Sequence, residues 1–134
     1  MNNVRINQFM SLVPFTVGSD QPLAVAHKLM NDHAIRHLPV LDGGQLVGVL
    51  TQRDLHLIET LKGVDTKSVP VSDAMSPEPY VVGPKATVRK VAAAMAEHKY
   101  GCAVVMEKDT VVGVFTTVDA LRALNTLLDG APGR

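Results

Sequence analysis

The sequence predicts an α/β (α+β) fold made of two similar repeats, each with the element order strand, helix, strand, strand, helix. Three observations support this prediction: the chain repeats itself, each copy has a segment of helical period, and each such segment precedes two short apolar runs. A shift of 65 residues places Met10 on Met75 and Asp54 on Asp119 without a gap. About 13 of about 45 aligned positions are identical, where unrelated sequence would give roughly three, which indicates an internal duplication.

The first two elements of each copy are a short strand and a helix. A proline precedes the extended segment, which covers residues 15–17 in the first copy and 80–82 in the second. Apolar residues and a final histidine then recur at helical spacing over residues 23–33 and 88–98. The same order of elements is therefore expected twice.

The start of each helix has its own signal. Ser19 or Asp20 can cap the first helix, because their side-chain oxygens accept backbone N–H groups that have no partner within the helix. Pro22 would then stand in the first turn, where its missing N–H is tolerated. Thr87 is the expected cap of the second helix.

Two short strands and a final helix complete each copy. A turn at Asp42-Gly43-Gly44 separates the first pair of apolar runs, and Glu107-Lys108-Asp109 separates the second pair. The runs are residues 37–41, 46–50, 102–106 and 111–115, and the final helices begin at Thr51 and Thr116 and extend to about Leu61 and Leu128. Because neither copy can bury both faces of its sheet alone, we expect the copies to pack sheet against sheet.

Composition narrows the classes of function. The chain has 13 Lys and Arg, 13 Asp and Glu and no basic block, so neither nucleic acid nor an anionic membrane surface is an expected partner. Cys102 is the single cysteine, which excludes an internal disulfide and suits a reducing compartment. No apolar run reaches the roughly 20 residues that a membrane-spanning helix needs, so we expect a cytoplasmic protein.

Several stretches carry a resemblance to a known family. Residues 36–40 with 46–55, and residues 101–105 with 111–121, resemble the carboxyl half of a cystathionine-β-synthase (CBS) domain. Met10-Ser11 and the segment 73–77 resemble the entry to such a domain. The resemblance implies CBS domain 1 at residues 9–62, a linker at 63–72, CBS domain 2 at 73–128 and a flexible tail at 129–134.

The resemblance also implies a function. Two CBS repeats of this kind pack with pseudo-twofold symmetry into a disc-like module, which often forms a homodimer. The two clefts between the repeats can take an adenosine ligand, with AMP, ADP, ATP and S-adenosylmethionine as candidates, and no further cofactor is implied. The expected function is a regulatory sensor that signals to an unidentified effector protein, and the first copy is similar to acetoin-utilisation-type proteins.

The pattern Gly-x-x-Thr-x-x-Asp occurs twice, at residues 48–54 and 113–119. It lies where a strand ends and a helix begins, so its hydroxyl and free backbone donors suit an anionic or oxygen-rich group. The resemblance implies that Asp54 and Asp119 bind ribose hydroxyls and that Thr51 and Thr116 contact ribose or phosphate. The alternative is a capping box, in which the same side chains only satisfy the helix start.

Other candidate ligand residues flank this motif. Arg53 and Arg36 favour the first copy for a phosphate-bearing ligand, because Val118 and Gly101 replace them in the second. The alternative for each is a solvated arginine on the surface. The resemblance further implies contacts with the ligand base from the ends of the first strands and the starts of the second: Thr16, Val17, His37, Leu38, Val81, Val82, Cys102 and Ala103. Leu38 and Ala103 can equally be core residues of their strands.

The sequence gives little support for a catalytic site or a metal site. The five histidines, His27, His33, His37, His56 and His98, do not have the spacing of metal ligands. Cys102 begins an apolar strand without a helix start or base that would activate its thiol. We therefore expect no enzyme, no catalytic residue and no metal site, and we keep a structural dimerisation module without a ligand as the alternative to a nucleotide sensor.

Overall fold

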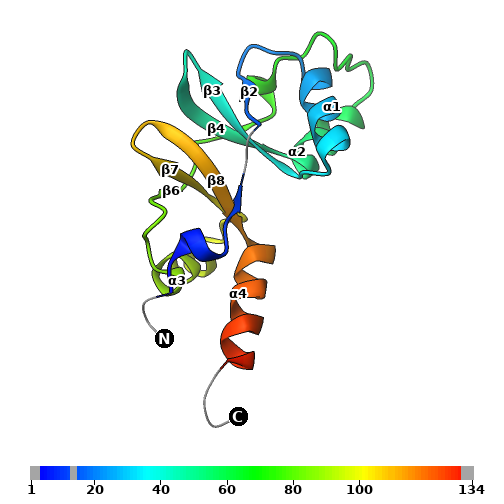
Figure 1. Ribbon diagram of the computed structural model, residues 1–134. Coiled ribbons are helices and arrows are strands. Elements are labelled where there is room, and N and C mark those ends of the chain that lie inside the picture. Colours follow the sequence, from blue (N-terminus) through cyan, green and yellow to red (C-terminus); the bar gives the residue numbers. More distant parts are fainter. Residues whose placement is uncertain (1–3, 13–14, 131–134) are drawn as a thin grey trace. The chain divides into compact units, whose positions relative to one another are not determined.

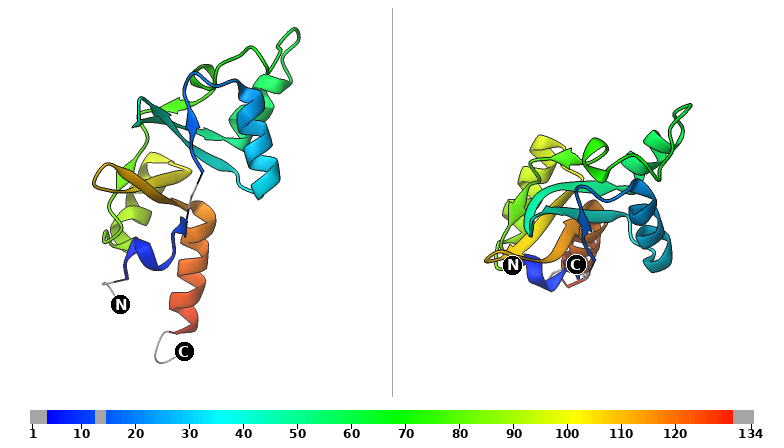
Figure 2. Two further views of the ribbon diagram at one scale, coloured as in Figure 1. Left: turned by 45° about the horizontal axis from the view of Figure 1, so that its top comes forward. Right: turned by 90° about the horizontal axis from the view of Figure 1, so that it is seen from above.

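The computed structural model describes residues 4–12 and 15–130 (Figure 1). These residues form a mixed α+β structure with two four-stranded sheets and four α-helices, which confirms the predicted fold class and the two repeats. Residues 131–134 of the predicted tail lie outside the described part. In both views of Figure 2 the helix of residues 23–33, in light blue, lies beside the hairpin of residues 37–51, in teal.

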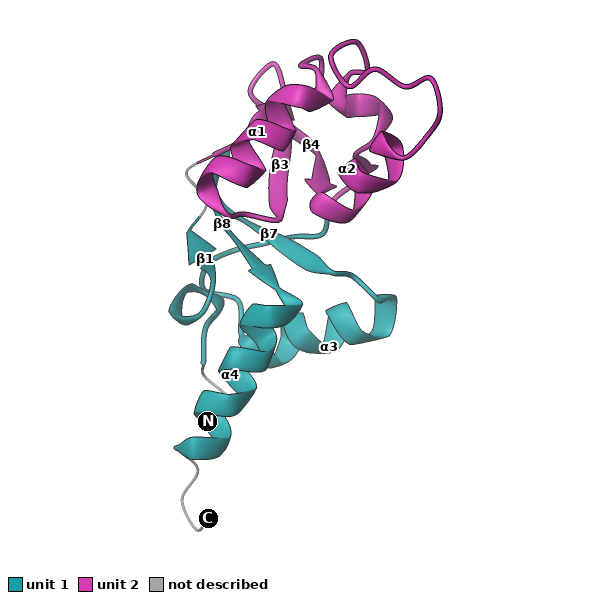
Figure 3. Cartoon of the chain, turned by 90° about the vertical axis from the view of Figure 1, so that its right-hand side faces the viewer, with its two compact units in different colours: residues 1–13, 80–134 teal, residues 14–79 magenta. Residues whose placement is uncertain are grey.

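The chain divides into two compact units (Figure 3). Unit 2 is continuous and contains residues 14–79, whereas unit 1 combines residues 1–13 with residues 80–134. The two units therefore do not coincide with the two sequence repeats, because unit 1 joins a segment of the first repeat to most of the second.

Unit 2 is built on a sheet with the strand order β2-β3-β4-β5. Its elements are β2 (Val17–Gly18), α1 (Leu23–His33), β3 (His37–Asp42), β4 (Gln45–Thr51), α2 (Gln52–Glu59), the 3-10 turn η2 (Val71–Asp73) and β5 (Ser76–Pro77). Apolar side chains from α1, β3, β4 and α2 form its core, among them Leu23, Leu38, Leu50 and Leu55. As predicted, a tight turn at Gly43 and Gly44 joins β3 to β4, and both glycines have positive φ.

Unit 1 repeats this arrangement with the strand order β1-β8-β7-β6. Its elements are η1 (Ile6–Gln8), β1 (Ser11–Leu12), β6 (Val81–Val82), α3 (Val88–His98), β7 (Cys102–Glu107), β8 (Thr110–Thr116) and α4 (Thr117–Asp129). Its core contains Val91 and Met95 from α3, Phe115 from β8 and Ala123 from α4. Ile6, far away in the sequence, completes this core with an exposed fraction of 0%.

Each repeat gives its opening strand to the sheet of the other. β1 pairs antiparallel with β8, and β5 pairs antiparallel with β4. The predicted element order lacked these two short strands, because two residues are too few to show a strand period. The exchange explains why unit 1 combines two stretches of the chain that are distant in the sequence.

The segments that lead into β1 and β5 are docked in the same way. We call residues 4–12 the amino-terminal segment and residues 69–77 the connector segment. The Val88 N–H donates to the Val4 carbonyl and the Leu23 N–H to the Val69 carbonyl, each at 2.9 Å. Ile6 and its equivalent Val71 are both fully buried. The structural repeat therefore begins at Val4 and Val69, ahead of the identities that start at Met10.

This docking corrects one predicted helix cap. The expectation that Ser19 or Asp20 caps α1 is wrong: the N-cap residue is Pro22, and no side chain caps it. The N-cap position holds a proline, whose side chain cannot accept a hydrogen bond, and the carbonyls of Val69 and Thr66 accept the first two helical N–H groups at 2.9 and 3.0 Å. Thr87 does cap α3, as predicted, by accepting the Lys90 N–H at 3.2 Å.

The remaining boundaries differ little from the predicted ones. The first strands are β2 and β6, at Val17–Gly18 and Val81–Val82, so residues 15, 16 and 80 precede them. Helix α2 ends at Glu59 rather than near Leu61, with Thr60 as its C-cap residue. None of the helices in the two described ranges has both the length and the apolar character that crossing a membrane requires.

Candidate functional site

The two Gly-x-x-Thr-x-x-Asp motifs join β4 to α2 and β8 to α4. In the first, the Asp54 N–H donates to Thr51 Oγ1 and the Thr51 N–H donates to Asp54 Oδ2, both at 3.1 Å. In the second, Thr116 and Asp119 make the same two bonds at 3.2 and 2.9 Å. Both motifs are therefore capping boxes, as one of the two interpretations of the sequence predicted.

The glycine of each motif has a packing role. A β-carbon built on Gly113 would lie 2.6 Å from the carbonyl oxygen of Ser11 in β1. A β-carbon on Gly48 would lie 2.8 Å from the carbonyl oxygen of Ser76 in β5. Only a residue without a β-carbon lets the exchanged strand approach so closely. The first residue of the motif thus belongs to the strand exchange.

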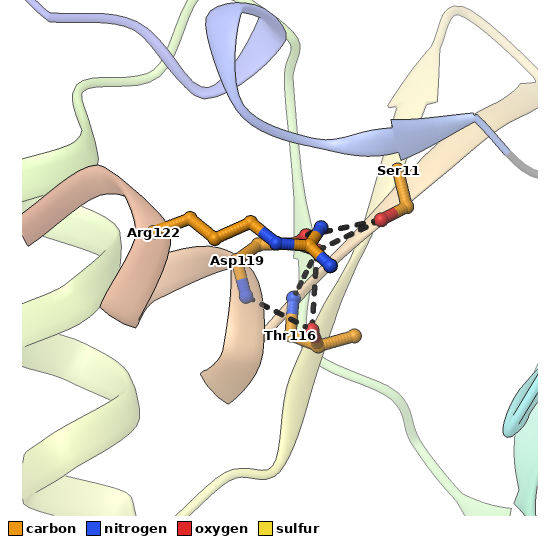
Figure 4. Close-up of polar contacts among 4 residues, drawn as sticks. All are labelled: Ser11, Thr116, Asp119 and Arg122. Atoms are coloured by element: carbon orange, nitrogen blue, oxygen red, sulfur yellow. Dashed lines mark hydrogen bonds and ion pairs between the residues drawn. The ribbon is translucent and has the colours of Figure 1, made fainter. Parts of the chain in front are cut away.

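The carboxylate of Asp119 is enclosed by protein donors (Figure 4). Its exposed fraction is 1%, and all its partners belong to unit 1. Ser11 Oγ lies 3.0 Å from Oδ1 and 3.2 Å from Oδ2, Thr116 Oγ1 donates to Oδ2 at 3.1 Å, and the Arg122 guanidinium contacts Oδ1 at 3.4 Å. Both carboxylate oxygens therefore already have partners.

Asp54 stands at the equivalent position but is more open. Its side chain is partly exposed, and Oδ2 accepts only the Thr51 N–H. Oδ1 of Asp54 has no hydrogen-bond partner within the described ranges. Because no buried side-chain oxygen in these ranges lacks a partner, Oδ1 is exposed to solvent. The Thr51 hydroxyl accepts the Asp54 N–H, and no described residue accepts its proton. Asp54 and Thr51 can thus still bind a group that carries hydroxyls.

The other candidate residues of the first copy lie on strands β3 and β2 of the unit 2 sheet, and only the start of β3 adjoins the motif. His37 pairs with Thr51 across β3 and β4, which places the start of β3 beside the start of α2. The parallel strand β2 pairs with the second half of β3, with Val17 opposite Val40, and Thr16 comes just before it. Leu38 and Val17 are buried, with exposed fractions of 0% and 2%, and belong to the core of unit 2.

The second copy repeats this placement in unit 1. Cys102 pairs with Thr116, and β6 runs parallel to β7 with Val81 and Val82 opposite residues 104 and 105. Ala103 is fully buried in the core of unit 1. Burial also raises the pKa of the Cys102 thiol from 9.0 to about 11, so this thiol is protonated at neutral pH.

Two arginines that make no contact with the motif aspartate lie beside the first motif, whereas Arg122 beside the second motif is bound to Asp119. Arg36 immediately precedes β3, and its carbonyl oxygen accepts the Gln52 N–H at the start of α2. Arg53 is exposed in the first turn of α2. Among the described residues neither guanidinium has a hydrogen-bond or ion-pair partner. A cation in the first turn opposes the helix dipole, so Arg53 does not stabilise α2.

Sequence reasoning missed two residues of the second motif. Ser11 lies 108 positions before Asp119 in the sequence and comes close to it only because β1 joins the sheet of unit 1. Arg122 lies one helical turn after Asp119, and Leu57 replaces it in the first copy. The i, i+3 spacing could have revealed Arg122, whereas no local signal indicates the contact with Ser11.

Comparison with known proteins assigns the family. The model of the CBS domain matches residues 6–57 and again residues 71–126. The CBS domain-containing protein YhcV of Bacillus subtilis is 30% identical over 88% of this chain and 82% of its own length. Inosine-5'-monophosphate dehydrogenase of Korarchaeum cryptofilum is 33% identical over 86% of this chain, which spans only 23% of that enzyme.

Solved structures agree with this match. AcuB of Vibrio cholerae, assigned to acetoin utilization, has 30% identity and a TM-score of 0.76, over 94% of this chain and 93% of its own. CBSX2 of Arabidopsis thaliana in complex with AMP has 23% identity and a TM-score of 0.78, over 92% and 98%. The CBS domain pair of MJ0100, in complex with 5'-methylthioadenosine and S-adenosyl-L-methionine, has 24% identity and a TM-score of 0.80, over 92% and 97%. The chain belongs to the CBS domain family and contains a tandem pair of these domains.

Proposed function

We propose that this protein is a regulatory module that binds an adenosine compound at the Thr51–Asp54 motif. The observation that carries this proposal is that Oδ1 of Asp54 is exposed to solvent and accepts no hydrogen bond within the described residues. The neighbouring Thr51 hydroxyl, at the start of α2, donates its proton to no described residue. The candidate ligands are AMP, ADP, ATP and S-adenosylmethionine. No catalytic role is proposed for any residue.

The chemistry of Asp54 and Thr51 suits a ribose. A carboxylate accepts hydrogen bonds only, and the two ribose hydroxyls are neighbouring donors that one carboxylate can engage together. Hydrogen bonds to an ionised acceptor are stronger than those between neutral groups. The Thr51 hydroxyl can add a further contact to an oxygen of the sugar or phosphate, because its proton is not used within the described residues.

The two arginines beside this motif suit a phosphate. Arg36 and Arg53 have no anionic partner among the described residues, and both stand next to the start of α2. Guanidinium groups bind phosphate oxygens in a planar, two-pronged geometry. We therefore propose a ligand with at least one phosphate over S-adenosylmethionine, which has none.

The two neighbours with bound ligands are consistent with this proposal. CBSX2 holds AMP, and the domain pair of MJ0100 holds two adenosine compounds without a phosphate. Their identities of 23% and 24% support a common fold, which is thus able to accommodate an adenosine group. The preference for a phosphate in this protein rests on its own Arg36 and Arg53.

Thermal unfolding in the presence of candidate ligands tests the proposal. AMP, ADP, ATP, S-adenosylmethionine and NAD are added separately at millimolar concentration. A ligand present at about 100 times its dissociation constant stabilises the folded state by about 2.7 kcal/mol, which raises the melting temperature by roughly 10 °C for a chain of this size. We expect such a shift with at least one compound that contains both adenosine and phosphate.

Variants identify the site. Asp54→Ala should remove the ligand-induced shift, measured against the melting temperature of the same variant without ligand, since the loss of the capping box lowers that temperature too. Asp42→Ala is the matched control, because this exposed aspartate lies at the opposite end of β3. Absence of any shift with all five compounds, or an equal shift in wild type and Asp54→Ala, would contradict the proposal.

A structural module without a ligand is the second candidate function. The enclosed carboxylate of Asp119 favours it, since this residue shows that the motif can serve the fold alone. In that case no adenosine compound changes the melting temperature, and Asp54→Ala only loses the energy of a helix cap. The thermal unfolding experiment therefore separates the two candidates.

The remaining parts of the proposal concern partners. We propose a homodimer, with the exposed apolar residues Leu121, Leu124 and Leu128 of α4 as a surface that a second copy would cover. We also propose a cytoplasmic location and an effector protein that distinguishes the liganded from the unliganded state. Sedimentation of wild type and Leu124→Glu tests the dimer: a monomeric wild type contradicts it.

A further inference from the structure

The two Thr-x-x-Asp motifs differ in what surrounds their carboxylates. Asp119 has an exposed fraction of 1%, and its two oxygens accept bonds from Ser11, Thr116 and Arg122 (Figure 4). A ribose hydroxyl could reach this carboxylate only by displacing these donors. Because a buried carboxylate is stable only when its oxygens are satisfied, the enclosure favours the state without a ligand at this position.

Ser11 ties the motif to the amino-terminal segment. This segment is held on unit 1 by bonds from the Ile6 N–H to the Ala86 carbonyl at 2.8 Å and from the Asn7 N–H to the Pro84 carbonyl at 2.9 Å. β1 then pairs with β8, and Ser11 directs its hydroxyl to Asp119. The contact between Ser11 and Asp119 is the last side-chain bond that fixes this segment before the chain enters unit 2.

The connector segment is docked on unit 2 in the same way but has no such bond. Ser76 is the equivalent of Ser11, yet it is exposed and makes no hydrogen bond with Asp54 among the described residues. Arg122 is also replaced by Leu57. The first motif thus lacks the serine and the arginine that help to enclose the second, and within the described residues the Thr51 hydroxyl does not donate to Asp54 as the Thr116 hydroxyl does to Asp119.

Chain connectivity gives a reason for this difference. The connector segment belongs to the same continuous stretch, residues 14–79, as the unit on which it docks. The amino-terminal segment docks on a unit whose motif lies 108 residues further along the chain. Closing a longer loop loses more conformational entropy, so the amino-terminal segment needs more contacts to stay in place.

We propose that the two motifs have separate roles: Asp119 holds the amino-terminal segment on unit 1 through Ser11, and only the Asp54 motif takes a ligand. Each chain accordingly binds one adenosine compound, not two. Ser11 is a positioning residue that ties the amino-terminal segment to Asp119, whose carboxylate Thr116 and Arg122 also enclose. The part of this inference that concerns the ligand rests on the proposed function, whereas the part that concerns the amino-terminal segment does not.

Calorimetric titration with AMP tests the part that concerns the ligand. We expect one molecule of AMP per chain for wild type, Ser11→Ala and Asp119→Asn, with dissociation constants within about threefold of one another, since neither variant touches the Asp54 motif. Asp54→Ala should bind none. Two molecules per chain in wild type, or loss of binding in Asp119→Asn, would overturn the inference.

Hydrogen exchange tests the other part without any ligand. In Ser11→Ala and Asp119→Asn the amides of Ile6 and Asn7 should exchange at least about tenfold faster than in wild type, because the segment loses its bond to a charged acceptor. Ser76→Ala is the matched control and should leave these amides unchanged. Equal exchange in wild type and Ser11→Ala would overturn the inference.

The two experiments also separate failure of the inference from failure of the proposed function. If wild type binds no AMP and no other adenosine compound, the proposed function is wrong and the ligand part falls with it. Faster exchange in Ser11→Ala would then still support the role of Asp119 in holding the amino-terminal segment.

Discussion

Asp54 and Asp119 each accept the backbone N–H of the threonine three residues earlier, Thr51 and Thr116. The two aspartates differ in the number of further donors that bind their carboxylates. Asp119 is in addition bound by Ser11 Oγ, Thr116 Oγ1 and Arg122. Asp54 has the capping bonds alone within the described ranges. A polar residue with many partners is costly to remove when it is buried, because its partners then lose their bonds as well.

Stability measurements should therefore distinguish the two aspartates. We expect Asp119→Ala to lower the free energy of unfolding by roughly 3 kcal/mol, since it leaves buried donors unsatisfied and detaches Ser11. Asp54→Ala should lower it by about 1 kcal/mol, the usual effect of a lost helix cap. Urea unfolding of the three proteins without ligand gives these values, and a larger effect of Asp54→Ala would contradict our description of the two motifs.

The Cys102 thiol gives a prediction on pH. Burial raises its pKa from 9.0 to about 11, so folding favours the protonated thiol. The folded-state pKa lies above the unfolded one, hence this contribution to stability is complete below pH 9 and is lost as the pH rises toward about 11. We expect wild type to lose more stability than Cys102→Ala over this range, as measured by urea unfolding at each pH. Equal losses in the two proteins would contradict the prediction.

Some residue roles could be predicted from the sequence and others could not. The capping bonds of Thr51, Asp54, Thr116 and Asp119 are local, so a spacing of three residues was sufficient to predict them. The bond from Ser11 to Asp119 joins positions 108 residues apart and depends on the exchange of β1. The binding roles of the candidate ligand residues stay predictions.

Among the elements, helices α1 and α3 illustrate what local signals miss. Both helices were predicted at the residues where they occur, because an apolar stripe over three turns is a strong signal. The cap of α1 was predicted wrongly, because its N-cap residue is a proline and the carbonyls of Val69 and Thr66 accept the first two helical N–H groups. Val4 is identical to Val69 in the repeat register, so a longer comparison of the two copies could have indicated this docking.

The two exchanged strands depend on the glycines opposite them. In Gly113→Ala the new β-carbon would stand 2.6 Å from the Ser11 carbonyl oxygen, so β1 must move away from β8. We expect a loss of about 2 kcal/mol in the free energy of unfolding, the usual effect of overpacking. Gly48→Ala should behave similarly through β5.

Gly83→Ala is the control for these variants. A β-carbon there would meet no atom within 4 Å, and Gly83 is not among the residues with positive φ. This substitution should leave the melting temperature unchanged or raise it slightly, because alanine restricts the unfolded chain more than glycine does. If Gly113→Ala were as stable as Gly83→Ala, the close approach of β1 would not be required for the fold.

On the scale of the whole molecule, the internal duplication could be predicted from the sequence, whereas the exchange of the two opening strands could not. The internal repeat follows from identities that any alignment of the two copies shows. Which unit each opening strand joins depends on tertiary contacts of Ile6 and Val71, two buried residues in segments too short for a period. Unit 1 consequently contains residues from both ends of the chain. A division of the sequence into consecutive domains cannot describe such a unit.

This organisation predicts that a residue near the amino terminus stabilises the second half of the chain. Ile6 is fully buried in the core of unit 1, so Ile6→Ala should lower the free energy of unfolding by about 3 kcal/mol. Asn7→Ala is the control, because the Asn7 side chain is exposed. Urea unfolding measures both variants, and a loss under about 1 kcal/mol in Ile6→Ala would mean that residues 4–12 are not part of this core.

The central claim of the account is that Asp54 binds the hydroxyls of a ribose. The most direct test is a double-mutant cycle with AMP and 2',3'-dideoxy-AMP, titrated calorimetrically into wild type and Asp54→Asn. Wild type should bind the dideoxy compound about 10- to 100-fold more weakly than AMP, as the loss of hydrogen bonds to a charged acceptor requires, and Asp54→Asn should discriminate far less. Equal affinity of wild type for the two compounds would contradict the claim.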